Sequence, residues 1–510
     1  MRESRAARVR ITRRRFLGGA AATAAVLTAG GASAVVLHER GGGGAKRTAI
    51  KPGALPQTTP GAQSDPLATA DLRLRHLLRR TTFAVLPADV QRFSGQPLDH
   101  VVDQLLDTAA VDDSAAEAKL ASFALDLRKP QGIISWWLAR MTLTRRPMLE
   151  RMTLFWHGLL TSGLAKTGAK GAPLLLNQNK LFRAHAFDKL DVLLKAVVRD
   201  PAMMLWLDIE TSRKGHPNEN YPRELMELFT LGVGNYTEQD VRESARAHTG
   251  YSLDRADCTF VFRPAQHDDG EKTFLGQTGN WDADSIVDII LKQPVAGDHF
   301  ARKLFEFFAY PAPDAATLKP IADVARSSGF DTRAVVRAIL TSDAFYAPQA
   351  YRAIVKSPTD YVVGAARLLG VESNGRALAG ASRLMGQVLF NPPNVAGWPG
   401  GRTWIGTSTW FARVNFAAAL INAGAPKRTT PAQAAGAAPL FASPPSSADD
   451  AIAQVATLTV DGQISAAVRS TLKDYLETGG GFATLPSAQR DERLRGLAAL
   501  LLASPEYQLA

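Results

Sequence analysis

Apolar residues recur every three or four positions along most of the chain. One block places Leu149, Met152, Phe155, Trp156 and Leu159 on a single helical face. This spacing is typical of an amphipathic α-helix, because it returns to the same face once per turn. Similar blocks continue toward the C-terminus. The pattern therefore predicts a mainly α protein with a multi-helix globular body.

One passage departs from this period and has the pattern of β-structure. The runs 259–262 and 272–274 are rich in β-branched and aromatic residues, and the dipeptide Asp269-Gly270 lies between them. Asp-Gly is a strong signal for a tight hairpin turn. We therefore expect the two runs to pair as one small β-hairpin inserted in the helical body.

Two stretches of small and polar residues divide the chain. The first, at 41–66, contains four consecutive glycines, and the second covers about 423–449. Neither has enough large apolar side chains to pack, so we expect a tether and a surface insertion respectively. The predicted organisation is a signal segment at 1–34, a flexible linker at 35–68 and a single large helical domain at 69–510. Whether that domain divides into two helical subdomains stays open.

The N-terminus has the form of an export signal. Seven arginines and one glutamate lie within the first fifteen residues, and Thr12-Arg13-Arg14-Arg15-Phe16-Leu17 follows the twin-arginine pattern. An uncharged run extends to Leu37 and contains the small-x-small cleavage sequence Ala32-Ser33-Ala34. The run is poor in strongly apolar residues, so cleavage is favoured over retention as a membrane anchor. These features predict export through the twin-arginine pathway to the periplasm, the cell wall or the medium.

The net charge of +11 is concentrated in this signal segment. Its first fifteen residues contribute +6, which leaves only +5 for the rest of the chain. A charge spread so thinly excludes an obvious nucleic-acid surface, which would cluster Lys and Arg on one face. The single cysteine, Cys258, excludes an internal disulfide, so stability must come from the hydrophobic core.

The familiar catalytic patterns are missing from the sequence. It contains no Gly-x-Ser-x-Gly elbow, no His-Glu-x-x-His helix, no Gly-x-x-x-x-Gly-Lys loop and no paired cysteines. The densest polar segment runs from Asp208 to Glu227, at the expected start of a helix. Its carboxylates suit either oxygen ligation of a divalent metal ion or general acid/base chemistry. The metal-ligand candidates are Asp208, Glu219, Glu224 and Glu227.

The same segment supplies several catalytic candidates. They are Asp208, Asn220, Arg223 and Glu224. Arg223 is also spaced to form an ion pair with Glu227 on one helix face. A purely structural role stays open, because capping residues and ion pairs are ordinary at the start of a helix.

Other candidates come from three separate passages. His157 lies at the edge of an apolar stripe, where an imidazole either faces a cleft or bonds a neighbouring polar group. The predicted hairpin loop concentrates His267, Asp268 and Lys272, although charges are also ordinary on turns. A loop rich in proline and tryptophan at 391–404 is suited either to covering a cleft or to locking two helices together.

Together these passages resemble the bacterial family of domain of unknown function 1800. The matching residues are Phe155-Trp156-His157, Asn218-Glu219-Asn220-Tyr221 with Arg223-Glu224-Leu225 and Glu227-Leu228-Phe229, His267-Asp268 with Gly270 and Lys272, and Asn391-Pro392-Pro393-Asn394-Val395 with Gly397-Trp398-Pro399. The resemblance extends from about His76 to the C-terminus, and it implies a mainly helical exported protein without an established activity. Two departures are Leu159, where the family often has a second histidine, and His248, where it often has an apolar residue. The first puts a histidine-pair metal site in doubt, and the second makes His248 a poor candidate.

Two functions remain open from the sequence. The first is an exported, hydrolase-like enzyme that uses either a divalent metal ion or acid/base chemistry. For its site, we expect Glu224 and Asp268 to lie near one cleft with His157 or Asn220, since polar groups must converge from separate segments.

The second function is a noncatalytic factor of the cell envelope. It would bind or assemble an extracellular protein, polymer or small molecule through exposed aromatic surface around Trp398 and Trp404. Membrane contact is expected only through an uncleaved signal segment. The sequence assigns no cofactor other than the divalent metal ion considered above.

Overall fold

The computed structural model describes two parts of the chain. These are residues 25–28 with 33–36, and residues 65–510 apart from 255, 423–439 and 442. The first part is an antiparallel pair of strands, β1 (Ala25–Thr28) and β2 (Ser33–Val36). Most of the predicted signal segment, linker and insertion lies outside the described residues. The chain from Gln63 to Ala510 forms one compact unit.

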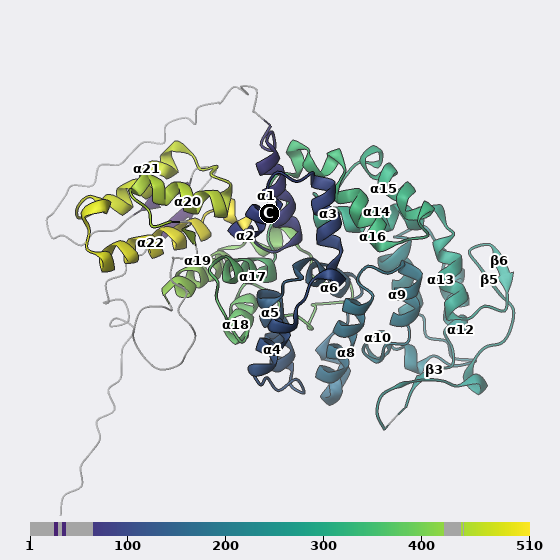
Figure 1. The fold of residues 1–510 in the computed structure, drawn as a ribbon. Coiled ribbons are helices and arrows are strands. Elements are labelled where there is room, and N and C mark those ends of the chain that lie inside the picture. Colours follow the sequence, from purple (N-terminus) through teal and green to yellow (C-terminus); the bar gives the residue numbers. More distant parts are fainter. Residues whose placement is uncertain (1–24, 29–32, 37–64, 255, 423–439, 442) are drawn as a thin grey trace, which may run out of the picture. The chain divides into compact units, whose positions relative to one another are not determined.

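This unit is built mainly from α-helices (Figure 1). Those up to residue 206 are α1 (Ala70–Thr81), α2 (Pro87–Phe93), α3 (Leu98–Leu106), α4 (Ser114–Ser122), α5 (Pro130–Leu143), α6 (Pro147–Leu159), α7 (Leu164–Thr167), α8 (Gly171–Ala184), α9 (Leu190–Val197) and α10 (Pro201–Trp206). Those that follow are α11 (Asn220–Glu224), α12 (Glu238–Ala247), α13 (Ala283–Leu291), α14 (Pro294–Phe308), α15 (Ala315–Ser327), α16 (Thr332–Leu340), α17 (Pro358–Leu368), α18 (Arg376–Leu384), α19 (Thr407–Asn422), α20 (Ala448–Val460), α21 (Ala466–Glu477) and α22 (Ser487–Leu502). The prediction of a mainly α, multi-helix body is confirmed.

Short strands form two antiparallel pairs between α12 and α13. β3 (Tyr251–Leu253) pairs with β4 (Phe260–Phe262), and β5 (Lys272–Phe274) pairs with β6 (Gln277–Gly279). The predicted pairing of 259–262 with 272–274 is therefore wrong, although each of these runs contains a strand.

The location of the tight turn explains this difference. Leu275 and Gly276 both have positive φ, of 46° and 77°, and they form the two-residue turn between β5 and β6. Tight hairpins need this backbone twist, but leucine rarely adopts it, so the sequence pattern favoured Asp269-Gly270 instead. In the structure, the Gly270 N–H donates to Asp268 Oδ1 over 2.9 Å, and the segment forms a separate loop.

Two hydrophobic clusters make the core of the unit. The first gathers α9 and α13–α16, and the second gathers α5 and α17–α22. Within the first cluster, α14, α15 and α16 lie side by side (Figure 1). The central helices α6, α8 and α10 contribute apolar side chains to both clusters. For example, Met152 and Phe155 of α6 enter the first cluster, whereas Leu154 enters the second.

Side-chain caps determine where several helices begin. At α12, Thr237 Oγ1 accepts a hydrogen bond from the Asp240 N–H, and Asp240 Oδ2 accepts one from the Thr237 N–H. This capping box satisfies N–H groups that have no partner inside the helix. It holds the start of α12 beside the candidate site described below.

The end of the predicted insertion packs against the helical body. Leu440 is fully buried in the second cluster, and Ser447 caps α20. The structure thus includes residues at the end of the 423–449 segment in the helical unit.

Candidate functional site

The polar segment identified in the sequence forms a helix with an unusual second half. α11 continues directly into η5 (Leu225–Thr230), which is a π-helix. The Thr230 hydroxyl donates to the Leu225 carbonyl over 2.5 Å, and the N–H groups of Leu231 and Gly232 both donate to the Met226 carbonyl. The helix ends at Gly232, whose φ of 82° suits glycine. This geometry places a widened helical turn immediately after Glu224.

Arg223 pairs with the neighbouring helix. Its two Nη groups each donate to Glu238 of α12 over 2.8 Å, and Nη2 also lies 3.3 Å from Glu219 Oε2. The predicted pair between Arg223 and Glu227 is wrong. Glu238 offers two oxygens to the planar guanidinium group, and such paired bonds are favourable. Glu227 instead accepts a hydrogen bond from the Tyr236 hydroxyl over 2.7 Å.

Glu224 differs from Asp208, Glu219 and Glu227 of this segment. Its side chain is half-buried and forms no hydrogen bond or ion pair within the part of the chain that the structure describes. Burial and the neighbouring Glu227 carboxylate raise the pKa of Glu224 above its ordinary value. Burial and the bond to Glu227 also raise the pKa of Tyr236 to about 12, so its hydroxyl remains a donor. Glu224 is therefore a carboxyl group that holds a proton more readily than an ordinary glutamate does.

Asp208 holds the start of the same helix. Its Oδ2 accepts hydrogen bonds from Asn220 Nδ2 over 2.7 Å and from Lys166 Nζ over 2.8 Å. Asp208 itself has a positive φ of 60°, at the end of α10 and the start of the 3₁₀-helix η4 (Ile209–Thr211). The Asp208 and Asn220 side chains thus bond to each other, and Lys166 is a partner that the sequence pattern did not reveal.

The four predicted metal ligands do not converge. Asp208 is bound to Lys166 and Asn220, Glu219 to Arg223, and Glu227 to Tyr236. Among the described residues, no group of three or more His, Cys, Asp or Glu is arranged to hold a metal ion. The predicted set of Asp208, Glu219, Glu224 and Glu227 is therefore not assembled in this structure.

The three candidates from the predicted hairpin form a network that supports the loop. Asp268 makes a bidentate pair with Arg246 of α12, at 2.8 and 3.1 Å, and this pairing lowers the pKa of Asp268 to about 2. Lys272 is buried, and its Nζ donates to the carbonyls of Asp268 and Gly270 over 2.6 and 2.9 Å. His267 Nδ1 donates to a carbonyl, that of Thr249, over 2.8 Å. These bonds occupy the Asp268 carboxylate, the Lys272 amine and Nδ1 of His267.

Glu224 and Asp268 therefore belong to separate polar clusters. Beside Glu224, Arg223 contacts Glu238 at the start of α12, whereas Asp268 contacts Arg246 near its end. A helix rises 1.5 Å per residue, so those two contacts lie roughly 12 Å apart along α12. No hydrogen bond or ion pair among the described residues joins the two clusters, so the shared cleft expected from the sequence stays a prediction.

His157 lies in the hydrophobic core. Its Nε2 accepts a hydrogen bond from the Phe390 N–H over 3.1 Å, and burial lowers its pKa to about 3. The rings of Trp137, Phe390 and Trp398 surround it at centroid distances of 5.0 to 5.6 Å. The imidazole is thus a neutral acceptor that holds a loop, and it makes no contact with Glu224 or Asp268.

The proline-rich loop packs against the C-terminal end of α6. The Thr161 hydroxyl donates to the Val395 carbonyl over 2.7 Å. At Gly397, φ is 78°, and an added Cβ would lie 2.7 Å from the Gly158 carbonyl oxygen, so only glycine allows this approach. Trp404 is only 7% exposed and Trp398 is half-buried. Neither tryptophan is exposed, whereas Phe411 of the following helix α19 is 55% exposed.

A buried ion cluster lies beside His157 and was not predicted from the sequence. Glu150 of α6 is fully buried and accepts hydrogen bonds from Arg140, Arg183 and Trp137 over 2.7 to 2.9 Å. Burial opposes the charge of Glu150, but the two arginines lower its pKa to about 2. The only signal for this cluster in the sequence was the position of Glu150 beside the apolar stripe of α6. Its partners could not be predicted, because they come from other helices.

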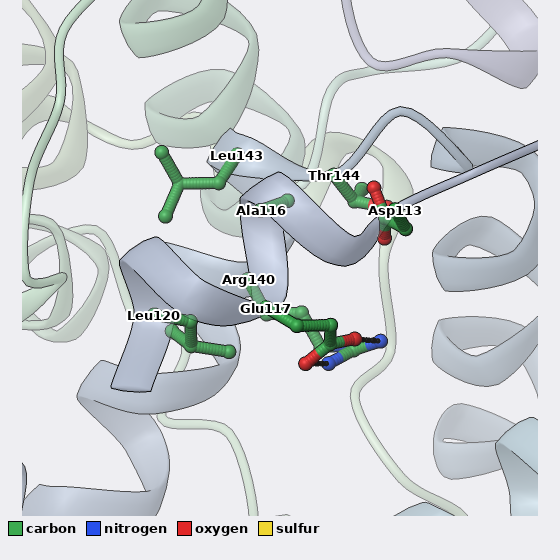
Figure 2. Close-up of a pocket in the computed structure, with 7 residues that line it drawn as sticks. All are labelled: Asp113, Ala116, Glu117, Leu120, Arg140, Leu143 and Thr144. Carbon is green, nitrogen blue, oxygen red and sulfur yellow. Dashed lines mark hydrogen bonds and ion pairs between the residues drawn. The ribbon is translucent and has the colours of Figure 1, made fainter. Parts of the chain in front are cut away.

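The hollow beside this cluster is too small for a substrate. It lies between α4 and α5, and Figure 2 shows Glu117 bonded to Arg140 at its edge. It leaves no space for a water-sized particle. The cluster therefore ties helices together and does not line a binding cavity.

The comparisons with known proteins concern the family and leave the chemistry open. No helix among the described residues combines the length and apolarity needed to cross a membrane. No curated protein matches the chain, and no solved structure does. A family model does match, under the description "Protein of unknown function (DUF1800)", and it covers residues 76–509. Since this range is most of the chain and includes all the passages described above, the protein belongs to the DUF1800 family.

Proposed function

We propose that this DUF1800 protein is an exported enzyme that performs acid/base chemistry at Glu224. The observation that carries the proposal is the unpaired, half-buried carboxyl group of Glu224 beside Glu227, whose carboxylate is held by Tyr236. Neighbouring carboxyl groups in unlike surroundings are suited to separate acid and base roles. Glu224 would donate a proton to a leaving group, and Glu227 would accept one from water, as in a hydrolase.

The backbone at this position supports the proposal. π-Helical turns are rare and are frequent at functional sites. Here the π-helix begins directly after Glu224 and contains Glu227. Asn220 and Arg223 bond to Asp208 and Glu238, so we assign them to positioning the helix. Asp208, His157, His267, Asp268 and Lys272 are given no proton-transfer role.

A substrate survey with matched variants tests this function. Purified protein is assayed against chromogenic esters, glycosides, phosphoesters and peptides, and Glu224→Gln is compared with the wild type. We expect turnover of one class and a loss of about 10²- to 10⁴-fold in the variant, because glutamine cannot donate the proton.

The control for this assay is Glu306→Gln. Glu306 of α14 is also half-buried and forms no hydrogen bond or ion pair with the residues that the structure describes. Its replacement should leave turnover unchanged. Equal rates for wild type and Glu224→Gln, or no turnover of any of these substrate classes, would contradict the proposal.

The proposed site of action is outside the cytoplasm. The support is the sequence Thr12-Arg13-Arg14-Arg15-Phe16-Leu17 ahead of an uncharged run. Replacing both Arg13 and Arg14 with lysine should leave the precursor inside the cell, as measured by cell fractionation. Normal export of that double variant would refute the twin-arginine route.

The noncatalytic envelope factor has less support. Its predicted binding surface required exposure of Trp398 and Trp404, and those side chains pack into the protein. We therefore retain the acid/base enzyme as the proposed function.

A further inference from the structure

The first helix of the compact unit buries an unusual amount of positive charge. Every residue of α1 from Leu74 to Thr81 is buried, and this stretch includes Arg75, His76, Arg79 and Arg80. Basic residues and leucines are interspersed along α1, so its charged side chains cannot all lie on one exposed face of the helix. Lysine and arginine side chains are seldom buried without partners of negative charge. These buried side chains therefore need neutralising groups nearby.

Arg79 and Arg80 belong to a larger group, which we call the basic cluster. Its members are Arg79, Arg80, Arg151, Arg352, Lys356 and Arg413. Their nearby carboxylates are Asp461, bound to Arg79, and Asp360, bound to Arg151. A third, the partly exposed Glu506, acts on Arg352. The cluster therefore carries more positive than negative charge.

Several of its donors also have no acceptor. Arg79 Nη1, Arg80 Nε and Nη1, and Arg413 Nε are buried without a hydrogen-bond partner. An unsatisfied buried donor costs about 1–3 kcal/mol, and more when the group is charged. Arginine cannot relieve this cost by losing its proton. A missing acceptor of negative charge near Arg79 would account for the excess positive charge and for the unpaired Arg79 Nη1.

A small pocket lies against two members of the cluster. Arg79, Lys356 and Tyr507 line it together with mainly apolar side chains such as Phe83 and Leu368. The centre of a water-sized particle can move within about 10 Å³ of this pocket, which is room for a single water molecule or one monatomic ion. Phosphate, sulfate and organic acids are too large for this space.

Lys356 is a buried lysine that lines this pocket. It is only 4% exposed, its Nζ forms no hydrogen bond within the described part of the chain, and Nζ lies 3.5 Å from the centroid of the Tyr507 ring. Burial, together with the positive charges of Arg79, Arg352 and Arg413, lowers its pKa well below the ordinary value, and Asp360 alone opposes them. The Tyr507 ring compensates a charged amine only in part, so either the amine is neutral or a bound anion completes the compensation.

We propose that this pocket binds one monovalent anion of halide size, held between Arg79 and Lys356. Loss of the lysine proton would remove one charge, but Arg79, Arg80 and Arg413 would stay charged and short of acceptors. A halide ion in the pocket supplies negative charge and can accept hydrogen bonds from the Arg79 and Lys356 side chains, which line it. The site shares no residue with the Glu224 cluster, so it is independent of the proposed enzyme function.

Thermal unfolding at constant ionic strength tests the site. Sodium chloride or bromide replaces sodium gluconate, whose anion is too large for the pocket. We expect the Tm of the full chain to rise with halide concentration and then to level off, because a ligand of the folded state stabilises it by mass action. Lys356→Met should abolish this dependence.

Lys272→Met provides the matched control. Lys272 is also a buried lysine, but its Nζ donates hydrogen bonds to three oxygens. This variant should melt earlier and keep the halide dependence. Equal Tm values for the wild type in halide and gluconate, or an unchanged halide dependence in Lys356→Met, would overturn the proposal.

A second measurement does not depend on the folding of any variant. Crystals of the wild-type protein grown in bromide should show an anomalous peak within hydrogen-bond reach of Arg79 and Lys356. A pocket without that peak at high bromide concentration would also overturn the proposal.

Discussion

At the scale of single residues, Glu150 shows how one buried charge depends on its partners. Its carboxylate is enclosed by Arg140, Arg183 and Trp137. Removing one member of a buried ion cluster leaves the others charged and unpaired, which usually costs ~3–5 kcal/mol. We expect Glu150→Gln to lose about that much stability at pH 7, as measured by urea unfolding.

The pH dependence of this loss has a definite sign. The pKa of Glu150 is lowered to about 2, so its contribution is complete above the unfolded pKa near 4.3 and is lost as the pH falls toward 2. The difference between wild type and variant should therefore shrink below about pH 4. A difference that stays constant from pH 7 to pH 2.5 would contradict this role.

Asp200 is expected to show the opposite dependence. It is buried at the start of α10, where burial raises its pKa to about 7 although Met203 N–H and Gln178 Nε2 donate to it. The folded state therefore binds a proton more tightly than the unfolded state, and stability falls as the pH rises from about 4 to 7. Asp200→Asn keeps the cap and removes the titration. Its Tm profile should be flatter than that of the wild type over this range, and parallel profiles would rule the account out.

The sequence identified candidate residues but did not show which of them have bonding partners. Glu224 was a candidate because it lies among other polar residues at a helix start, and it remains one. Asp268 and His157 looked similar in sequence, but their partners, Arg246 and the Phe390 N–H, are 22 and 233 residues away. Pairing over such separations is decided by tertiary packing, which local spacing does not contain.

At the scale of elements, the long helices and the strands β4 and β5 were predictable, but the pairing of the strands was not. Apolar residues recur on one face of α6 over three turns, so several positions in the sequence indicate which face is buried. Each strand between α12 and α13 is three residues long, and its partner depends on one turn. The π-helix η5 depends on bonds from Thr230 and its neighbours, for which no sequence period exists.

The strand region should be held mainly by α12. Arg246 bonds to Asp268 and to the Glu271 carbonyl, so Arg246→Gln should release β5 and β6. We expect faster amide exchange in residues 272–279 and no change in α14. Hydrogen–deuterium exchange with mass spectrometry measures this directly, and unchanged exchange in 272–279 would show that other contacts hold these strands.

At the scale of the whole molecule, the two hydrophobic clusters are joined by α6, α8 and α10. Because these helices contribute to both clusters, neither can unfold without exposing apolar surface of the other. We expect α14 and α17 to lose protection at the same denaturant concentration in pulsed hydrogen exchange. Separate midpoints would instead establish two helical subdomains that unfold independently.

In the proposed mechanism, Glu224 is a carboxyl group prepared for proton transfer. Difference infrared spectroscopy of wild type against Glu224→Gln, recorded through a pH titration, follows the protonation of this one group. Burial and Glu227 raise its pKa, so its midpoint should lie above the ordinary glutamate value of about 4.3, whereas the Glu306→Gln difference serves as the control. A Glu224 midpoint at or below that value would contradict the acid/base account.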